Sequence, residues 1–268
     1  MSFALIPYLE QPSLDLGFAQ IHAWGTLVAI GFLFGTSYAA RWMNRNGLDG
    51  ETAYDFGMWV FVGGFTGAHL VHALFYEPHR LAEDPLFLLR IWEGVSSFGG
   101  FLGGAVASVL FFKKRGTRFV EHANPLALGM APGWAIGRIG CFFAHDHIGA
   151  RTDFILAVDF PTTWGPLGGP RHDLGLYDSI LSWILFAVLL FLARSRPRHG
   201  LLAGVLCAGY ALPRFFFDFL RATDATYGGL TPGQYGSVVL FIFGVALAWS
   251  SRGEGRDGEP GKRTPSDA

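Results

Sequence analysis

The sequence ANPLALGMAPGWAIGRIGCFFAHDHIG, residues 123–149, places one arginine inside a run that is otherwise apolar and uncharged until its last few residues. Such a run predicts a membrane-spanning helix. Because a guanidinium group is costly in hydrocarbon, Arg138 is expected to face a partner or a water-filled cavity. His145, Asp146 and His147 follow shortly after it. A fixed cation beside titratable groups predicts an anion-binding site, and the alternative is a structural arginine paired with a carboxylate of another helix.

The composition of the whole chain is also that of a membrane protein. Of 268 residues, 51% are hydrophobic and 15% are charged, and the mean hydropathy is +0.34, which is too apolar for an ordinary soluble domain. The net charge of −1 does not indicate a nucleic-acid partner. Cys141 and Cys207 lie in apolar runs and do not predict a disulfide framework. The N-terminus lacks the features of a cleaved signal peptide, so the first apolar run is expected to remain as an anchor.

Seven stretches are apolar enough to cross a membrane, which takes about 20 residues. They lie near residues 22–40, 56–76, 95–112, 124–144, 177–193, 201–219 and 233–250. The predicted fold class is therefore all-α, a polytopic membrane protein with seven transmembrane helices. We expect residues 1–250 to form a single integral membrane domain. Residues 251–268 are rich in glycine, proline and charge, which predicts a disordered tail.

The basic residues predict the orientation, because lysine and arginine near helix ends favour the cytoplasm. Thirteen of the 20 basic residues fall after the first, third, fifth and seventh stretches, at positions 41, 45, 113–115, 118, 194, 196, 198, 252, 256, 262 and 263. The N-terminus is therefore expected in the periplasm and the C-terminus in the cytoplasm. The Arg138 segment and the connection from about 145 to 176 then lie on the outer side. That connection is long enough to suggest a lid or a docking segment, with a plain connector as the alternative.

Two further arginines are candidates for the same anion site. Arg214 and Arg221 lie near the outer end of the sixth stretch. Arginine suits phosphate because its planar fork donates two hydrogen bonds to one oxyanion. Arg214 and Asp218 are four residues apart and share a helix face, so a self-contained ion pair is the alternative. Several guanidinium groups at one membrane face predict a site for a phospholipid head group.

Proton-transferring groups are predicted next to Arg138. The candidates are His145, Asp146, His147 and Asp218, because histidine exchanges protons near neutral pH and carboxylates accept them. His69, His72, His145 and His147 are the candidate ligands of an alternative metal site, but no HExxH or Cys-x-x-Cys pattern supports it. We therefore expect neither a metal nor another cofactor. The Gly99–Gly100 pair, in another part of the chain, predicts close helix packing or the passage of a lipid chain.

These residues together resemble the prolipoprotein diacylglyceryl transferase family over about residues 20–250. The most specific segment, GRIGCFFAHDHIG, is similar to the family signature Gly-Arg-x-Gly-Asn-Phe-x-Asn-x-Glu-x-x-Gly. The segments IHAWG, GAHLVHALFY, IWEGVSSFGGFLGG, PRHDLGLYDS and RFFFDFLR follow the family's order and spacing. The resemblance implies a bacterial inner-membrane enzyme that moves diacylglyceryl from phosphatidylglycerol to a lipobox cysteine thiol of a prolipoprotein signal peptide, releasing glycerol-1-phosphate.

The resemblance also implies roles for individual residues. Arg138 and Arg214 stand at the essential arginines that hold phosphate, and Asp146 and Asp218 stand where the family has glutamate. With these, His145 completes the predicted catalytic set of Arg138, Arg214, Asp146 and His145. The predicted substrate-binding residues are Gly149, Trp24, Cys141, Tyr177, Asp218, Arg221, Gly99 and Gly100.

Several positions depart from the family pattern. Phe98 replaces a histidine, Cys141 and Ala144 replace two asparagines, Trp24 replaces a tyrosine and His69 replaces an arginine. Three hypotheses follow. The chain is a working diacylglyceryl transferase, a divergent enzyme with another acceptor or reaction on an anionic lipid, or a non-catalytic lipid-binding or partner-binding membrane protein.

Overall fold

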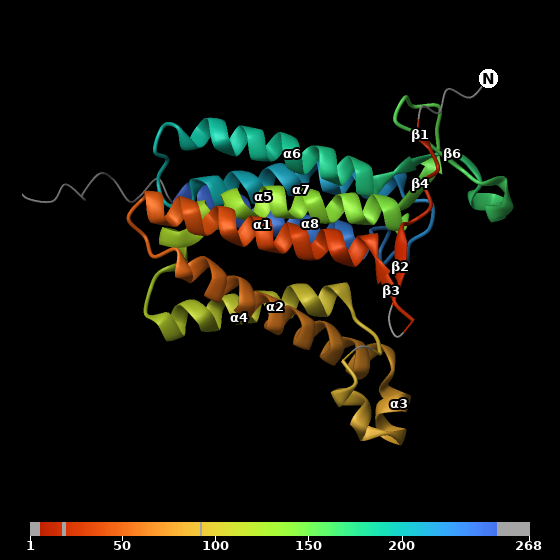
Figure 1. The fold of residues 1–268 in the computed structure, drawn as a ribbon, viewed down its shortest axis with the longest axis horizontal. Helices are drawn as coiled ribbons and strands as arrows, with labels where there is room; N and C mark the ends of the chain where they lie inside the picture. The colour runs from red at the N-terminus through yellow and green to blue at the C-terminus, as the bar shows by residue number, and fades with distance from the viewer. Residues whose placement is uncertain (1–5, 18–19, 92, 251–268) are drawn as a thin grey trace, which may run out of the picture.

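Long helices running side by side build most of the molecule (Figure 1). The computed structural model describes residues 6–17, 20–91 and 93–250; the predicted tail at 251–268 lies outside them. The long helices are α1 (Ala23–Arg45), α2 (Glu51–Val71), α4 (Ser97–Arg115), α5 (Phe119–Ala144), α6 (Leu174–Ala193), α7 (Leu201–Phe217) and α8 (Pro232–Ser250). Tight connections join α1 to α2, α4 to α5 and α6 to α7 at one end. The longer connections gather at the other end, called here the sheet end.

Six helices are long and apolar enough to cross a membrane: α1, α2 with its continuation, α5, α6, α7 with its continuation, and α8. This confirms a multi-pass helical membrane protein. The seventh predicted span, at residues 95–112, forms the 19-residue helix α4, which packs along α2. Glycine, serine and its basic last turn leave it without an uninterrupted apolar stretch like those of the other six. Seven spans and the orientation of the termini therefore stay predictions.

Short β-strands at the sheet end were not part of the all-α prediction. β1 (Ile6–Pro7), β4 (Ile148–Arg151), β5 (Val158–Phe160) and β6 (Gly169–Asp173) form one sheet in the order β1-β5-β6-β4. β2 (Ser13–Asp15) pairs with β3 (Gln20–His22) in a hairpin. The connection from α5 to α6, with the 3₁₀ helix η3 (Thr162–Leu167), is thus a folded cap rather than an open loop. Its core is the cluster of Phe142, Val158 and Phe160.

Glycines let three helix pairs approach closely. A Cβ atom added at Gly133 of α5 would lie 2.6 Å from the carbonyl oxygen of Gly31 in α1, and one at Gly35 would lie 2.7 Å from that of Gly129. Similar approaches join α7 to α8 through Gly204 and α2 to α4 through Gly67. Without a hydrophobic effect between helices in lipid, such small-residue contacts supply the packing energy. The α2–α4 contact accounts for Gly99, whose added Cβ would meet the α2 backbone and Val71.

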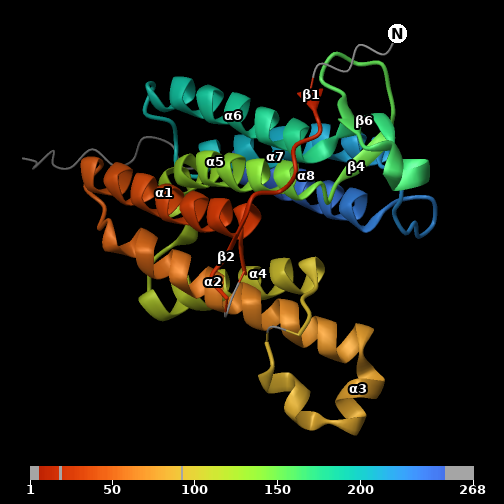
Figure 2. The same cartoon turned by 45° about the vertical axis from the view of Figure 1, so that its right-hand side comes forward.

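Helices α2 and α4 form an arm beside the main bundle of α1 and α5 to α8 (Figure 2). The arm ends in a π-helical turn η1 (His72–Tyr76), the short helix α3 (Pro78–Glu83) and the 3₁₀ helix η2 (Pro85–Leu89). His69 is buried at this joint, with Nδ1 3.0 Å from the carbonyl oxygen of Gly94 and Nε2 3.1 Å from that of Phe87. Both ring nitrogens are therefore occupied by backbone, which argues against the metal alternative at His69.

A buried cluster of alanine and leucine side chains holds α5 to α6, α7 and α8. At the end opposite the sheet, the Asn124 amide donates to the carbonyl oxygen of Arg198 at 2.8 Å and accepts from the N–H of Leu202 at 2.9 Å. Asn124 thereby satisfies a backbone N–H in the first turn of α7. These contacts fix α5 relative to α6 and α7, the three helices that carry the charged groups described next.

A candidate phospholipid head-group site

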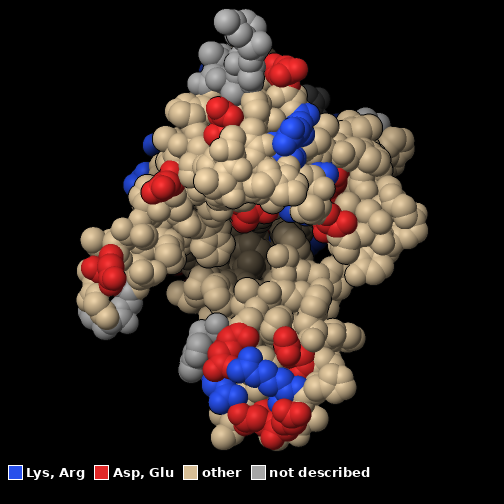
Figure 3. Space-filling model, turned by 90° about the vertical axis from the view of Figure 1, so that its right-hand side faces the viewer, with Lys and Arg blue, Asp and Glu red and all other residues tan. Residues whose placement is uncertain are grey.

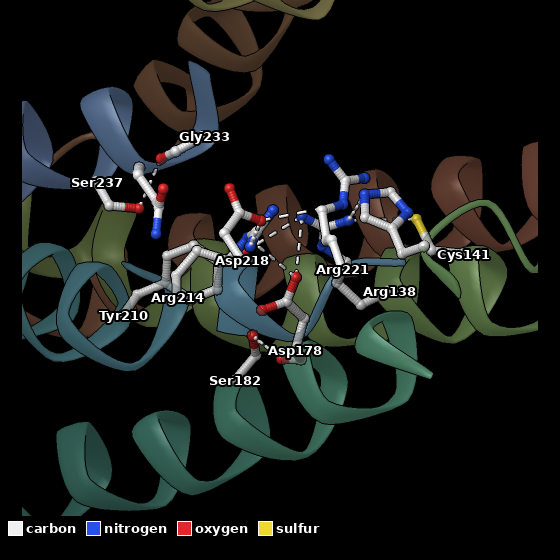
Figure 4. A network of polar contacts seen from close by, with 12 residues as sticks. Arg138, Cys141, Asp178, Ser182, Tyr210, Arg214, Asp218, Arg221, Gly233 and Ser237 are labelled. Atoms are coloured by element: carbon white, nitrogen blue, oxygen red, sulfur yellow. Dashed lines mark hydrogen bonds and ion pairs between the residues drawn. The ribbon is translucent and has the colours of Figure 1, made fainter. Parts of the chain in front are cut away.

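Three arginines from separate parts of the chain converge near the sheet end (Figure 4). Arg138 lies in the last third of α5, Arg214 near the end of α7, and Arg221 directly after the 3₁₀ helix η4 (Asp218–Leu220). Two carboxylates, Asp178 of α6 and Asp218 of η4, lie among them. Arg138 and Arg214 lie directly against these carboxylates, whereas Arg221 also has a carboxylate of its own, Asp224.

Asp178 is the point where Arg138 and Arg214 meet. Its side chain is fully buried, and its Oδ2 atom lies 3.2 Å from a terminal nitrogen of Arg138 and 3.5 Å from Nε of Arg214. The two guanidinium groups thus reach one carboxylate oxygen from two different helices. For Arg138 this is the alternative that the sequence left open, an arginine paired with a carboxylate of another helix, and the pairing also brings the two guanidinium groups to one oxygen.

Arg138 makes several weak contacts rather than one tight pair. Its terminal nitrogens donate to the Tyr210 hydroxyl at 3.3 Å and to Cys141 Sγ at 3.5 Å, and its guanidinium lies 4.8 Å from the Trp134 ring centroid. Its Nε is buried and makes no hydrogen bond within the described residues. Donors held in long contacts can be redirected to a stronger acceptor, so Arg138 retains capacity for a ligand.

Arg214 and Arg221 are more firmly paired. Arg214 bonds to Asp218, the self-pair that the four-residue spacing predicted, and also reaches Asp178. Arg221 pairs with Asp224 and lies 4.0 Å from Asp218. Arg214 therefore forms the self-contained pair that the sequence left open as the alternative, and it also joins the group around Arg138.

Gly149 positions the segment that carries Arg221. The two residues form an antiparallel bridge, and the N–H of Ala222 donates to the carbonyl oxygen of Ile148 at 3.1 Å. A Cβ atom at Gly149 would lie 2.6 Å from the Cβ of His172 and 2.9 Å from the carbonyl oxygen of Leu220. The predicted substrate-binding glycine thus acts in this structure through close backbone packing.

Asp146, His147 and Cys141 form a second polar group beside Arg138. His147 Nδ1 bonds to the Asp146 carboxylate, and His147 Nε2 accepts from Arg138 at 3.3 Å. One potential ligand atom from each of Cys141, Asp146 and His147 lies within 4.8 Å of the others, so the three could hold a metal ion. However, an Arg138 nitrogen already donates to both Cys141 Sγ and His147 Nε2. The guanidinium supplies the positive charge that a metal would bring there.

His145 lies apart from this group, although it is only two residues away from His147. It ends α5 in the left-handed conformation, with φ 50°. Its Nδ1 lies 3.1 Å from Asp173 Oδ2, its Nε2 lies 3.0 Å from the carbonyl oxygen of Leu9, and its ring stacks on Tyr8. The structure therefore places His145 as a buried brace between α5 and the cap, and its predicted catalytic role receives no support from this geometry.

Tyr177 points to His172 rather than to the arginines. Its hydroxyl lies 2.7 Å from His172 Nδ1 in β6, and burial lowers the pKa of His172. The neighbouring Arg171 donates to the carbonyl oxygens of Gly149 and Pro166, and burial together with Arg151 lowers its pKa. These contacts tie the cap to the start of α6.

The remaining predicted residues lie outside the arginine group. Trp24 is half exposed and lines a shallow pocket of about 230 Å³ with Gln11, His22, Ala144 and Asp146. Gly99 and Gly100 lie in the arm, away from the arginines. Phe98, at the start of α4, is 67% exposed. Seen from the sheet end, the surface is hollowed between bundle and arm, with acidic and basic side chains on its rim (Figure 3).

Two members of the central group were not among the predicted site residues. Asp178 and Tyr210 contact Arg138 from α6 and α7. The signal for Asp178 was present, because it is an uncompensated carboxylate inside an apolar run. Tyr210 carried no comparable signal, since a tyrosine near a membrane-helix end is common.

Comparison with known proteins identifies relatives over nearly the whole chain. The family model described as prolipoprotein diacylglyceryl transferase matches residues 12–250. The phosphatidylglycerol–prolipoprotein diacylglyceryl transferase of Chromohalobacter salexigens is 33% identical, covering 92% of this chain and 94% of that protein. Proteins of the same name from Pseudomonas entomophila and Allorhizobium ampelinum are 31% and 32% identical, covering 91% and 96% of this chain and 94% and 96% of their own lengths. The chain therefore belongs to the prolipoprotein diacylglyceryl transferase family.

Proposed function

We propose that this chain transfers the diacylglyceryl group of phosphatidylglycerol to the thiol of a lipobox cysteine in a prolipoprotein signal peptide. The thiolate sulfur attacks the terminal glycerol carbon of the diacylglyceryl group, the bond from that carbon to the phosphate oxygen breaks, and glycerol-1-phosphate leaves. A thioether is formed, and the thiol proton passes to a base. The proposal rests on family membership and on the convergence of Arg138 and Arg214.

The observation that carries the proposal is that Arg138 and Arg214 share one oxygen of Asp178. When phosphatidylglycerol enters, its phosphate competes for donors that now contact a carboxylate. As the carbon–oxygen bond breaks, negative charge grows on the departing phosphate. Guanidinium groups that are already oriented and withdrawn from bulk water stabilise this charge without reorganisation. Arg221, linked to the cap through Gly149, extends the positive charge toward the sheet end.

We place the site at the periplasmic face of a bacterial inner membrane. The supporting observations are the 13 basic residues expected at the opposite end and the position of α4 beside α2. With its 19 residues, α4 is about 28 Å long, close to the thickness of the hydrocarbon core. A seven-span arrangement then puts the cap outside and the end of α8 inside. Reporter fusions within residues 161–168 and after residue 250 test this; periplasmic activity at both positions would contradict it.

The function is tested by complementation of a bacterial strain depleted of its own transferase. The wild-type chain should restore lipidation of a lipobox substrate, seen as a mass increase or a gel shift. Arg138→Ala and Arg214→Ala should each abolish it while inserting normally. Arg151→Ala, an exposed residue of the cap, serves as the matched control and should retain activity.

Other outcomes separate the alternatives. If the wild-type chain restores no lipidation but changes the phospholipid or glycolipid profile of the cells, the acceptor or the reaction differs. If it does neither, and Arg138→Ala has no effect on growth, the chain is a non-catalytic lipid-binding protein.

A further inference from the structure

We propose that His147, held by Asp146, is the general base that takes the proton from the acceptor thiol, and that the pocket beside Trp24 admits that thiol. The inference rests on the proposed function and deepens it, because it names the proton acceptor and the route of the peptide substrate. Three observations support it: the hydrogen bonds of His147, its position between the arginine group and the pocket beside Trp24, and the requirement of the reaction for a deprotonated thiol.

The hydrogen bonds of His147 define which nitrogen can accept a proton. Nδ1 faces the Asp146 carboxylate, which can only accept, so Nδ1 carries the hydrogen. Nε2 is left with its lone pair, and it faces a nitrogen of Arg138 at 3.3 Å. A carboxylate that holds Nδ1–H in this way fixes both the tautomer and the ring orientation, as an orienting group does for a histidine base. The Asp146–His147 pair therefore presents a basic nitrogen to the anion site.

The position of the pair suits transfer of a proton from thiol to base. His147 is mostly buried, with 18% of its side chain exposed, whereas 43% of the Asp146 side chain is exposed. Asp146 also lines the 230 Å³ pocket formed with Gln11, His22, Trp24 and Ala144. On one side of the pair lie the guanidinium groups, and on the other lies an open pocket. A thiol that enters from the pocket passes Asp146 and reaches His147 on its way to the guanidinium groups.

The reaction needs such a base. An ordinary cysteine thiol has a pKa near 8.5, so the nucleophilic thiolate is a minor species at neutral pH. The sulfur must approach to about 3–3.5 Å from the carbon that it attacks. The leaving phosphate, on the far side of that carbon, is the group that Arg138 holds. His147 contacts Arg138 on one side and Asp146, which lines the pocket, on the other, so it lies between the phosphate position and the pocket from which the sulfur approaches. The released proton ends on His147, and the sulfur's electron pair forms the new bond to carbon.

Among the described residues, the charged and titratable groups around His147 come from three elements. Asp146 adjoins it, Arg138 and Cys141 face it from α5, and Asp178 faces it from α6. When phosphatidylglycerol binds, Arg138 donates its hydrogen bonds to the phosphate instead. The lone pair of His147 Nε2, which accepts from Arg138 in the absence of lipid, then becomes free. Binding of the lipid thus frees the base, which orders the two substrates: lipid first, then peptide.

The test measures the rate of transfer from phosphatidylglycerol vesicles to a synthetic lipobox peptide across pH 5.5 to 8.5. In the wild type, kcat should rise with pH, because a general base accepts the thiol proton only in its unprotonated form. His147→Gln should lower kcat about 100-fold or more and abolish this rise, with the KM for phosphatidylglycerol little changed. Asp146→Asn should lower kcat less. His79→Gln, an exposed histidine of α3, is the matched control.

A second variant separates a base from a structural brace. His147→Ala leaves a space for free imidazole, and added imidazole should restore part of the lost rate. Thermal unfolding in detergent reports whether each variant is folded. If His147→Gln keeps the wild-type pH profile, or if imidazole gives no rescue in a folded His147→Ala protein, His147 is not the base and the proposed transfer still stands. If the wild-type protein transfers no diacylglyceryl group, both proposals fail.

Discussion

At the scale of single residues, Asp178 neutralises and stabilises the buried arginines when no lipid is bound. It is fully buried in α6, and it neutralises part of the charge of Arg138 and Arg214. Breaking a buried ion pair from one side costs about 3–5 kcal/mol, because the remaining charge is left without a partner. Asp178 therefore keeps the empty site folded and also competes with the phosphate that the site is proposed to bind.

This dual role gives a prediction for Asp178→Asn. The substitution keeps the shape of the side chain and removes its charge, so the free energy of unfolding should fall, and added phosphatidylglycerol should recover most of the loss, since a ligand that binds the folded state stabilises it. Thermal unfolding in detergent with and without the lipid measures both effects. Asp15→Asn, exposed in β2, is the control. A variant as stable as the wild type without lipid would contradict the role given to Asp178.

At the scale of elements, the α1–α5 contact and the cap hold the site in place. Arg138 lies five residues beyond Gly133, where the backbone of α5 packs closely against Gly31 of α1. The cap joins β4 to the Arg221 segment and β6 to the start of α6, which carries Asp178. Substitutions in either contact should therefore disturb the positions of the arginines and Asp178, even though no charged residue is replaced.

The glycine contact predicts that Gly133→Ala is destabilising. The new Cβ would lie 2.6 Å from a backbone oxygen that cannot move without separating the helices. Overpacking of this kind costs about 1–3 kcal/mol. Gly137→Ala is the matched control on the same helix, since its Cβ would meet one Val28 carbon at 3.9 Å. Thermal unfolding of the two proteins should differ, and equal midpoints would show that the close approach does not matter.

The cap should loosen in acid because of His172. Burial lowers the pKa of this side chain in the folded protein, so the unfolded chain binds a proton first as the pH falls. The stability of the cap should therefore be unaffected well above the unfolded pKa of about 6.5 and should decrease as the pH falls below it. Hydrogen exchange in residues 148–173 at pH 5.5 and 7.5 measures this. His172→Gln should reduce the difference; an unchanged difference would assign it to another group.

At the scale of the whole molecule, the sequence predicted the helices well and the cap poorly. Long apolar runs carry their own signal, so the predicted stretch at 177–193 became Leu174–Ala193 and that at 201–219 became Leu201–Phe217 with η4. Strands of two to five residues carry little signal. Their pairing is also remote in sequence, as between Ile6 and Val158, so the all-α prediction omitted them.

The site was predictable to the extent that its residues were charged and intramembrane. Arg138, Arg214 and Asp218 met this criterion and do lie together. The choice between His145 and His147 could not be made from sequence, because both have the same chemistry. The left-handed turn at His145 sends one imidazole to Asp173 and the other to Arg138. Such a turn at a non-glycine residue depends on the packing around it.

The central claim is that Arg138 and Arg214 bind one phosphate. It is tested most directly by a double-mutant cycle on the affinity of the purified protein for phosphatidylglycerol, with uncharged diacylglycerol as the control ligand. Each of Arg138→Ala and Arg214→Ala should weaken phosphatidylglycerol binding and leave diacylglycerol binding unchanged. The double variant should depart from additivity by about 0.5–3 kcal/mol, as groups that share a partner do. Strict additivity, or equal losses for both ligands, would contradict a shared phosphate.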